Sequence, residues 1–322
     1  MAPFPTIGII SKRGDASAAQ TLHRLVKLLI RQAPGNGVQS ILVSDDSDID
    51  LTATGALNGV DIVPRDQLAQ RASMAIVVGG DGTLLSAARS LVNYEVPILG
   101  INHGRLGFLV EVGPDEITSA IGAVFNGQYY IAERFVLSAE IRHADGSLTP
   151  PALAINDVVL RNRASIRMIE YETWLSRDPQ RPMGAQWEFI SRHRADGLII
   201  STPTGSTAYA LSGGGPVLHP GLSAVALVPI CPHTLTDRPI AVPASRAIRI
   251  VQCGDGEHDA HVTCDGQVNF ELAHDDAVEL HRALHPLRLL HPAGYSYFRL
   301  LRDKLLWGRA PESTPSPSGN GS

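Results

Sequence analysis

The chain has 322 residues, 44% of them hydrophobic and 18% charged, and a formal net charge of −5 at pH 7. This size favours a globular protein of two domains, and the acidic balance argues against a general nucleic-acid binder. No apolar run approaches the ~18 residues of a membrane span, the first residues lack a secretory signal, and an odd number of cysteines fits a reducing compartment. We therefore expect a cytoplasmic protein that binds neither nucleic acid nor membrane.

The N-terminal third alternates predicted strands with predicted helices. Met74–Val78 is a continuous apolar run, which is typical of a strand buried on both faces of a parallel sheet. Asp15 is a good N-cap for a helix whose apolar residues recur on one face. The alternation predicts a Rossmann-like parallel sheet. Its strands are expected at Thr6–Ile10, Ser40–Val43, Met74–Val78 and Pro97–Ile101, and a second helix over Thr83–Leu91.

From Phe135 onwards the chain consists of short β-forming stretches separated by Gly, Pro, Asn and Asp. This pattern predicts a mainly antiparallel β domain. The stretches are Phe135–Arg142, Asp157–Asn162, Met168–Leu175, Trp187–Ser191, Leu198–Ser201, Ala247–Val251, His261–Cys264 and Ala277–His281. Tyr295–Trp307 has helical character, and the last residues are rich in Pro, Ser and Gly, which predicts disorder.

The first candidate site is Gly79-Gly80-Asp81-Gly82-Thr83, between the strand at 74–78 and a helix. Glycines at the carboxyl end of a strand let the backbone approach a ligand, and the helix N-terminus favours an anion. An acid beside phosphates would be repelled unless it binds a metal or accepts a proton. The alternative, that Asp-Gly makes a tight turn and Asp81 caps the next helix, fits these five residues equally well.

Two further segments carry polar groups suited to a nucleotide. Asn156-Asp157 offers donors and acceptors side by side, although a turn is the commoner role for this pair. Ser201–Tyr209 holds five hydroxyl residues within seven positions, and Tyr209 is suited to stacking on a base. Gly213–Pro216 follows and permits close backbone approach. This second segment predicts a loop that binds a polyhydroxylated, phosphate-bearing ligand.

One rival metal site lies near the C-terminus. Cys253, His258, His261 and Cys264 fall within twelve residues, and Cys and His are zinc ligands. Their spacing matches no standard finger, and strand alternation would place His261 and Cys264 on opposite faces. We therefore expect no protein metal site here.

Together these motifs resemble those of the bacterial NAD kinases. TPTGSTAY is the specific element, because lipid kinases and 6-phosphofructokinases share the GGDG run but not the sequence downstream. The resemblance spans most of the chain, through GGDGTLLSAAR, INHGRLGFL, INDVV, ADGLIISTPTGSTAYALSGGGP, PICPHTLTDRPI, CDGQ and FRLLRDKLLWG.

The resemblance implies an α/β N-terminal domain with a Rossmann-like parallel sheet, a β-rich, sandwich-like C-terminal domain, and a final helix that returns to the first domain. We expect the first domain at 1–134 plus 286–308, the NAD-binding domain at 135–285, and a disordered tail at 309–322. Members of the family are typically homo-oligomers, so a dimer or tetramer is expected.

The implied reaction moves the γ-phosphoryl group of ATP to the 2′-hydroxyl of the adenosine ribose of NAD, giving NADP. Asp81 would be the base that activates this hydroxyl. Gly82 would line the nucleotide site, Asp196 would hold ribose hydroxyls, and Gln267 would supply a contacting amide. The other nucleotide-binding residues would be Asn156, Asp157, Arg167, Arg194, Thr207, Ala208, Tyr209, Ala210, Leu211 and Ser212.

The chain contains no P-loop, so the triphosphate must be held in another way. We expect it to be held by the glycine backbones at 79–82, by the loop at 102–107 with Arg105, and by Mg²⁺ or another divalent cation. The cation would be coordinated mainly by phosphates and water. Two alternatives stay open. A lipid or sugar kinase would share the GGDG loop but leave TPTGSTAY unexplained. A non-catalytic NAD(P)-binding regulator would have no need of a carboxylate beside phosphates.

Overall fold

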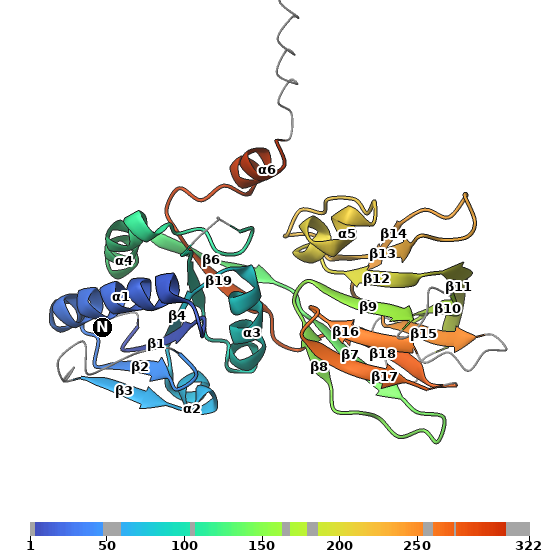
Figure 1. Ribbon diagram of the computed structural model, residues 1–322, viewed down its shortest axis with the longest axis horizontal. Helices are drawn as coiled ribbons and strands as arrows, with labels where there is room; N and C mark the ends of the chain where they lie inside the picture. The colour runs from blue at the N-terminus through green and yellow to red at the C-terminus, as the bar shows by residue number, and fades with distance from the viewer. Residues whose placement is uncertain are drawn as a thin grey trace, which may run out of the picture.

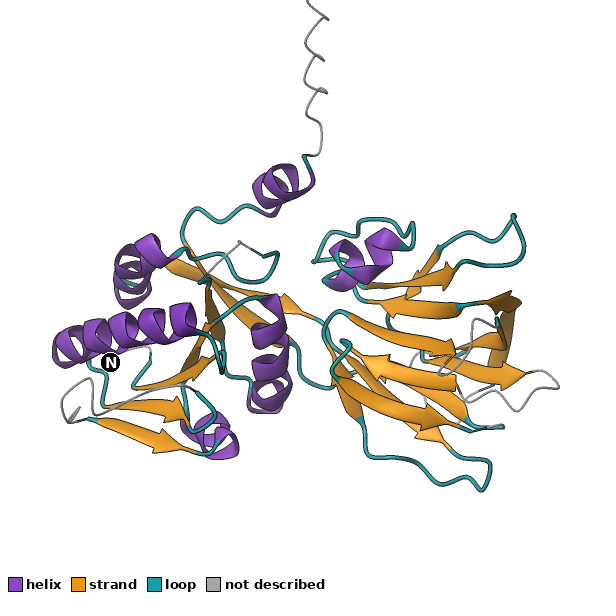
Figure 2. Ribbon diagram, in the orientation of Figure 1, coloured by secondary structure: helices purple, strands orange, loops and turns teal. Residues whose placement is uncertain are grey.

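A computed structural model of the chain describes residues 4–47, 59–103, 107–162, 168–178, 186–253, 260–273 and 275–306. It shows two domains side by side, one built of helices and strands and the other almost entirely of strands (Figures 1 and 2). Within the described residues, no helix is both long and apolar enough to cross a membrane.

The first domain is organised around a seven-stranded sheet. Its order is β3-β2-β1-β4-β5-β19-β6, and all neighbours are parallel except β6, which runs antiparallel to β19. The predicted parallel sheet is therefore confirmed. The strands are β1 (Thr6–Ser11), β2 (Ser40–Ser44), β3 (Val60–Val63), β4 (Met74–Val78), β5 (Ile98–Ile101), β6 (Tyr129–Arg134) and β19 (Leu287–Pro292).

Helices cover both faces of this sheet. On one face α1 (Ala16–Asn36) and α4 (Ile117–Phe125) share a core with Ile7 and Ile9, and on the other α2 (Arg65–Arg71) and α3 (Asp81–Leu91) share a core with Ile10. The predicted N-cap of α1 is confirmed, because Asp15 Oδ1 accepts the N–H groups of the next turn at 3.0 and 3.1 Å. Short 3₁₀ turns lie at Val92–Tyr94 and Pro114–Glu116.

The second domain is a sandwich of two antiparallel six-stranded sheets, with the orders β11-β10-β15-β18-β7-β8 and β14-β13-β12-β9-β16-β17. Both sheets contribute to one apolar core, for example Tyr171 from the first and Val158 from the second. The strands are β7 (Leu137–Arg142), β8 (Ala152–Ala154), β9 (Asp157–Asn162), β10 (Ile169–Ser176), β11 (Trp187–Ala195), β12 (Gly197–Ser201), β13 (Ala224–Ile230), β14 (Ile240–Pro243), β15 (Ile248–Cys253), β16 (Ala260–Cys264), β17 (Val268–Leu272) and β18 (Ala277–Arg282).

All eight β-forming stretches predicted from the sequence are strands. The elements that were not predicted include α2, α4, β6, β14, β17 and β19. A short segment of η3 (Gly205–Thr207) and α5 (Tyr209–Ser212) follows β12, where only a loop was expected.

The two domains meet at α3 and again at α6 (Tyr297–Leu305). Ile155 of the second domain belongs to the same apolar core as the buried face of α3. Helix α6 lies between the domains (Figure 1). Together with α4 it borders a cavity of about 440 Å³, and its Tyr297 hydroxyl donates to the carbonyl of Leu218 in the second domain at 3.4 Å. The final helix thus contacts both domains.

Candidate active site

The Gly79–Thr83 turn lies at the carboxyl end of β4, where α3 begins. The N-cap of α3 is Gly80, and no side chain caps the helix. The alternative role of Asp81 as the helix cap is therefore wrong. Its carboxylate instead accepts backbone N–H groups from the loop after β5: Phe108 at 2.8 Å, Leu109 at 3.1 Å and Val110 at 3.2 Å.

These three hydrogen bonds fix the Asp81 carboxylate and still leave it able to accept another hydrogen bond. Oδ1 accepts two N–H groups and Oδ2 accepts one, whereas an ionised carboxylate has about four acceptor positions. The loop approaches so closely that a Cβ on Gly107 would collide with the carboxylate. Asp81 is thus held rigidly with room for about one further donor.

A cavity of about 620 Å³ lies beside this turn, and we call it the basic cavity. Its lining includes Gly80, Gly82 and the cationic side chains of Lys12, Arg13 and Arg65. Arg65 is positioned by hydrogen bonds to Asp46 at 2.5 Å and to Ser86 at 3.0 Å. With one carboxylate against three cations in the lining, the basic cavity suits an anionic ligand such as a chain of phosphates.

A second cavity, of about 340 Å³, lies against the turn that joins β16 to β17, and we call it the hairpin cavity. It brings together four of the residues singled out in the sequence: Asn156, Asp157, Ala208 and Tyr209. Asn156 and Asp157 come from the start of β9, while Ala208 and Tyr209 come from the segment after β12. Asp81 does not belong to the described lining of either cavity.

Asp157 is the chemically unusual group of the hairpin cavity. Burial, assisted by the neighbouring charge of Asp265, raises the pKa of Asp157 to about 7. A carboxyl group that titrates near neutrality in a cavity is a common mark of a functional site. Asp265 is also buried, and its carboxylate accepts the N–H groups of Ile155, Asn156 and Asp157 at 2.8 to 3.3 Å.

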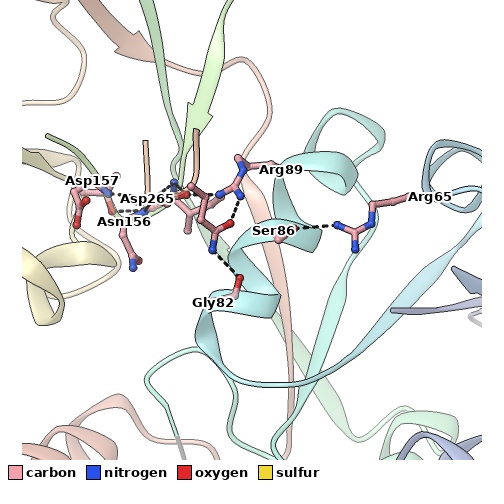
Figure 3. A network of polar contacts seen from close by, with 10 residues as sticks. Arg65, Gly82, Ser86, Arg89, Asn156, Asp157 and Asp265 are labelled. Atoms are coloured by element: carbon pink, nitrogen blue, oxygen red, sulfur yellow. Dashed lines mark hydrogen bonds and ion pairs between the residues drawn. The ribbon is translucent and has the colours of Figure 1, made fainter. Parts of the chain in front are cut away.

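The basic and hairpin cavities are joined through Gln267. Its Nε2 donates to the carbonyl of Gly82 at 3.0 Å, and Gly82 lines the basic cavity. Two residues earlier in the chain, Asp265 lines the hairpin cavity. Figure 3 shows Gly82 and Asn156 on either side of this connection, with the Asn156 side chain pointing away from Asp265. Gly82 of the basic cavity and Asp265 of the hairpin cavity are thus linked through Gln267.

Comparison with known proteins agrees with this arrangement. The ATP-NAD kinase N-terminal domain model matches residues 7–129 and the C-terminal domain model matches residues 156–291. A protein named NAD kinase from Teredinibacter turnerae is 42% identical over 311 residues, covering 95% of this chain and 98% of the relative. One from Chromohalobacter salexigens is 42% identical over 308 residues, with the same coverage of both chains. The chain belongs to the NAD kinase family.

The solved NAD kinase structures share the fold. A yeast NADH kinase complexed with NADH has a TM-score of 0.85 at 22% identity, with 97% of this chain and 90% of the other covered. An NAD kinase from Archaeoglobus fulgidus in complex with ATP has a TM-score of 0.69 at 24% identity, with 94% and 98% covered.

Other residues implied by the NAD kinase resemblance lie elsewhere. Arg194 is exposed near the end of β11, and Asp196 is exposed between β11 and β12. Neither is among the residues that line the hairpin cavity, although Arg161, which lines it, pairs with Gly197, the residue after Asp196. Ala210 is buried and packs against Ile199 and Val228. Arg167 and Arg105 lie outside the described residues.

The hydroxyl-rich segment of this NAD kinase folds differently from the expectation. Thr202 Oγ1 donates to Ile155 O at 2.6 Å, and Ser206 Oγ donates to Pro203 O at 2.7 Å and accepts from Leu218 N at 2.9 Å. Ser201, Thr202 and Ser206 are fully buried. These hydroxyl groups shape the turn, because buried polar groups need partners inside the protein. Of this segment, Ala208 and Tyr209 line the hairpin cavity.

Of the rival metal residues, His258 lies outside the described part of the chain. Cys264 belongs to the sandwich core, whereas His261 Nε2 pairs with Asn269 Oδ1 at 3.1 Å. Among the described residues, no group of three or more His, Cys, Asp or Glu side chains is arranged to hold a metal.

Sequence reasoning missed several residues of the site. Lys12, Arg13 and Arg65 line the basic cavity but belong to no motif, and only the structure brings them to the GGDG turn. Asp265 could have been found, because Asp-Gly between two β-forming stretches is a strong signal for a type I′ hairpin turn. Asp265 and Gly266 have φ values of 51° and 64°, as such a turn requires.

Proposed function

We propose that this member of the NAD kinase family transfers the γ-phosphoryl group of ATP to the 2′-hydroxyl of the adenosine ribose of NAD, giving NADP. One observation carries the proposal. The Asp81 carboxylate is fixed by three N–H groups and retains an open acceptor position. It adjoins Gly82, which lines a cavity rich in cations and accepts a hydrogen bond from Gln267, in the hairpin turn beside the second, polar cavity.

The chemistry assigned to Asp81 is proton acceptance. A ribose hydroxyl is a poor nucleophile at neutral pH, and a positioned base contributes roughly 10²–10⁴-fold to the rate of such a step. Phosphoryl transfer otherwise needs alignment and charge neutralisation. The basic cavity supplies charge through Lys12, Arg13 and Arg65, and exposed backbone N–H groups at the start of α3 favour an anion.

The NAD ligand is assigned to the hairpin cavity. Asn156 and Asp157 offer polar groups to the nucleoside, and Tyr209, which is 46% exposed, offers a ring face. The amide of Gln267 closes the space towards Gly82. The other residues that we keep in the binding proposal are Gly82, Arg167, Arg194, Asp196, Thr207, Ala208, Ala210, Leu211 and Ser212.

A divalent cation, Mg²⁺ by preference, is proposed to enter with ATP. Asp46 and Asn102 line the basic cavity and carry the oxygen atoms that Mg²⁺ takes as ligands. When bound, the ion would neutralise phosphate charge. The protein's own part is to present these oxygens and the neighbouring cations.

We also propose a cytoplasmic homo-oligomer, with functional units at 1–134 plus 286–308 and at 135–285. The strands of the first sheet end at Arg134 and resume at Leu287, which supports this division. The oligomer is proposed on the resemblance to the bacterial NAD kinases, whose members are typically homo-oligomers. Light scattering coupled to size-exclusion chromatography measures the state directly.

The direct test is incubation with NAD, ATP and Mg²⁺ followed by a coupled enzymatic assay for NADP. Parallel reactions replace NAD with diacylglycerol, a sphingoid base or fructose 6-phosphate. NADP formation that depends on ATP supports the proposal. Phosphorylation of one of the other acceptors alone, or NAD binding without turnover, would transfer the assignment to a lipid or sugar kinase or to a regulator.

The base assignment predicts the behaviour of Asp81→Asn. We expect kcat to fall by roughly 10²–10⁴-fold because the proton acceptor is lost. The Kd for NAD, measured by calorimetry, should change far less.

The matched control for this variant is Glu116→Gln. Glu116 also accepts a backbone N–H from a loop, that of Gly113 at 2.9 Å, but it lies outside both site cavities. The control should keep normal turnover. Turnover of Asp81→Asn within about threefold of the wild type would reject Asp81 as the base.

A further inference from the structure

Asp265 connects the NAD-binding residues to the hairpin turn between β16 and β17. Its side chain is fully buried and accepts three consecutive backbone N–H groups, from Ile155, Asn156 and Asp157. In return, the Asp265 N–H donates to the carbonyl of Asp157 at 2.9 Å. The side chain and the backbone of Asp265 therefore both hold the backbone at the start of β9. This fixes where the Asn156 and Asp157 side chains lie.

Arg89 connects the same residue to the other domain. It lies in the last turn of α3, the helix that begins at Asp81, and only 15% of its side chain is exposed. One guanidinium nitrogen pairs with Asp265 Oδ2 at 2.9 Å and the other with Gln267 Oε1. Gln267 in turn donates to Gly82 at the first turn of α3. The two ends of α3 are thus tied to one hairpin turn (Figure 3).

The charges of this cluster are mutually satisfied. Burial raises the pKa of Asp265, but the amides of Ile155 and Asn156 and the Arg89 guanidinium oppose the shift. Four donors pointing at one carboxylate favour its ionised form. The planar fork of arginine suits this role, because it reaches two acceptors at once, which a lysine cannot do in the same geometry.

We propose that Arg89, Asp265 and Gln267 form an interdomain latch that positions the base of one domain against the nucleotide held by the other. The inference rests on the proposed function. Asp81 and Gly82 belong to α3, Asn156 directly precedes β9 and Asp157 begins it, and the latch lies within hydrogen-bonding distance of both segments. Arg89 and Asp265 are positioning residues, because they touch the residues that are proposed to hold substrate.

The test uses Asp265→Asn, Arg89→Ala and Arg89→Lys in the full-length protein. Asparagine tolerates the left-handed turn conformation that Asp265 adopts, so the first variant keeps the turn and removes the charge. Misplacement by about 1 Å can cost about 10²-fold in rate. We expect kcat to fall by roughly 10- to 100-fold in Asp265→Asn and Arg89→Ala. Arg89→Lys should recover part of the loss.

The control is Glu279→Gln, which removes a comparable buried charge elsewhere. Glu279 is 1% exposed and pairs with Arg142 and Arg249 on the outer face of the first six-stranded sheet of the sandwich. It should lower the melting temperature and leave kcat within about twofold. The two variants are compared at an equal fall in melting temperature. If Asp265→Asn then loses no more kcat than Glu279→Gln does, the latch is overturned.

A second readout does not depend on turnover. Amide hydrogen exchange should accelerate at 155–157 in Arg89→Ala, although Arg89 itself belongs to the other domain. Unchanged exchange at 155–157 in that variant contradicts the latch even if the protein makes no NADP. A wild-type protein that makes no NADP rejects the proposed function instead, so the two failures are distinguishable.

Discussion

Asp157 sits in a cavity that disfavours its charge. Its side chain is 6% exposed, it lies beside Asp265, and its pKa is raised from 3.8 to about 7. The unfolded chain releases this proton at lower pH than the folded chain does. The free energy of unfolding therefore falls as the pH rises from about 4 to about 7, and this contribution is constant above that range. Ionisation of the buried Asp157 carboxyl group therefore lowers the free energy of unfolding.

We predict that Asp157→Asn stabilises the protein more at pH 8 than at pH 5. The charged and titratable groups around Asp157 (Asp265, Arg161, Arg89, Cys264 and Tyr209) are unchanged by the substitution. At ~1.36 kcal/mol per pKa unit, the shift from 3.8 to about 7 makes the gain about 4 kcal/mol above pH 7 and roughly a third of that at pH 5. Urea unfolding at the two pH values measures it. An equal gain at both would contradict the raised pKa.

At the same scale, the sequence singled out Asp81 and Asn156–Asp157 but not what surrounds them. A lone acid among glycines signals function locally, whereas Asn-Asp by itself favours a turn and gained its proposed role only through the resemblance. Lys12, Arg13 and Arg65 could not be found, because they reach the basic cavity from positions distant in sequence from the GGDG turn. Arg89 lies within GGDGTLLSAAR, but its partner Asp265 is 176 residues away. Their placement depends on strand order, which local patterns do not encode.

At the level of elements, the segment between β12 and β13 shows how composition can mislead. The many hydroxyl groups of this segment predicted ligand contact. The Thr202 and Ser206 hydroxyls instead form hydrogen bonds with backbone groups of the protein. Gly205 has the same structural role, since a Cβ there would collide with the carbonyl of Asn156. The motif is specific because it fits one turn against β9, and this fit places Ala208 and Tyr209 at the cavity.

Ser206→Ala should therefore act mainly on stability. The substitution leaves the buried N–H of Leu218 and the carbonyl of Pro203 without their present partner, which costs about 1–3 kcal/mol. Thr207→Ala is the comparison, because its hydroxyl makes one long bond of 3.4 Å in a less buried setting and should cost less. Chemical denaturation measures both. A large rise in KM for NAD with normal stability in Ser206→Ala would restore the ligand-binding interpretation.

Other elements were predictable for ordinary reasons. β4 is a continuous apolar run and β9 contains one at 158–160, and all the predicted strands were found. β6 and β17 were missed because each mixes polar with apolar residues and is partly exposed. Turn residues adjoin both strands, so their limits were not recognised in the sequence. α4 was missed because Gly122 interrupts its pattern.

On the scale of the whole molecule, two connections between the domains can be named among the residues that the structure describes. One is the latch at α3, and the other is α6, which packs Leu300 and Leu301 inward and reaches His219 of the second domain. The His219 ring lies 5.2 Å from the ring of Tyr297 and 5.6 Å from that of Phe298. The basic cavity is lined by residues of the first domain and the hairpin cavity by residues of the second, so both connections bear on how the two cavities are aligned.

We expect His219→Ala to loosen α6 without affecting the chemistry directly. The variant loses two ring contacts and should be less stable by about 1 kcal/mol. Amide exchange should accelerate across α6 while the 155–157 segment stays protected. Exchange in α6 equal to that of the wild type would show that His219 does not anchor the helix.

β19 has a consequence for how the protein is made. This strand comes from the end of the chain but lies between β5 and β6 in the first sheet, pairing with both. Until residues 287–292 have left the ribosome, β6 has no neighbour, and the first sheet stays open at its edge. The N-terminal domain therefore cannot finish folding ahead of the C-terminal one, as domains synthesised first usually do. A fragment that ends before β19 would leave the edge of β5 unpaired and prone to aggregation. The two domains must therefore be expressed and engineered as one unit.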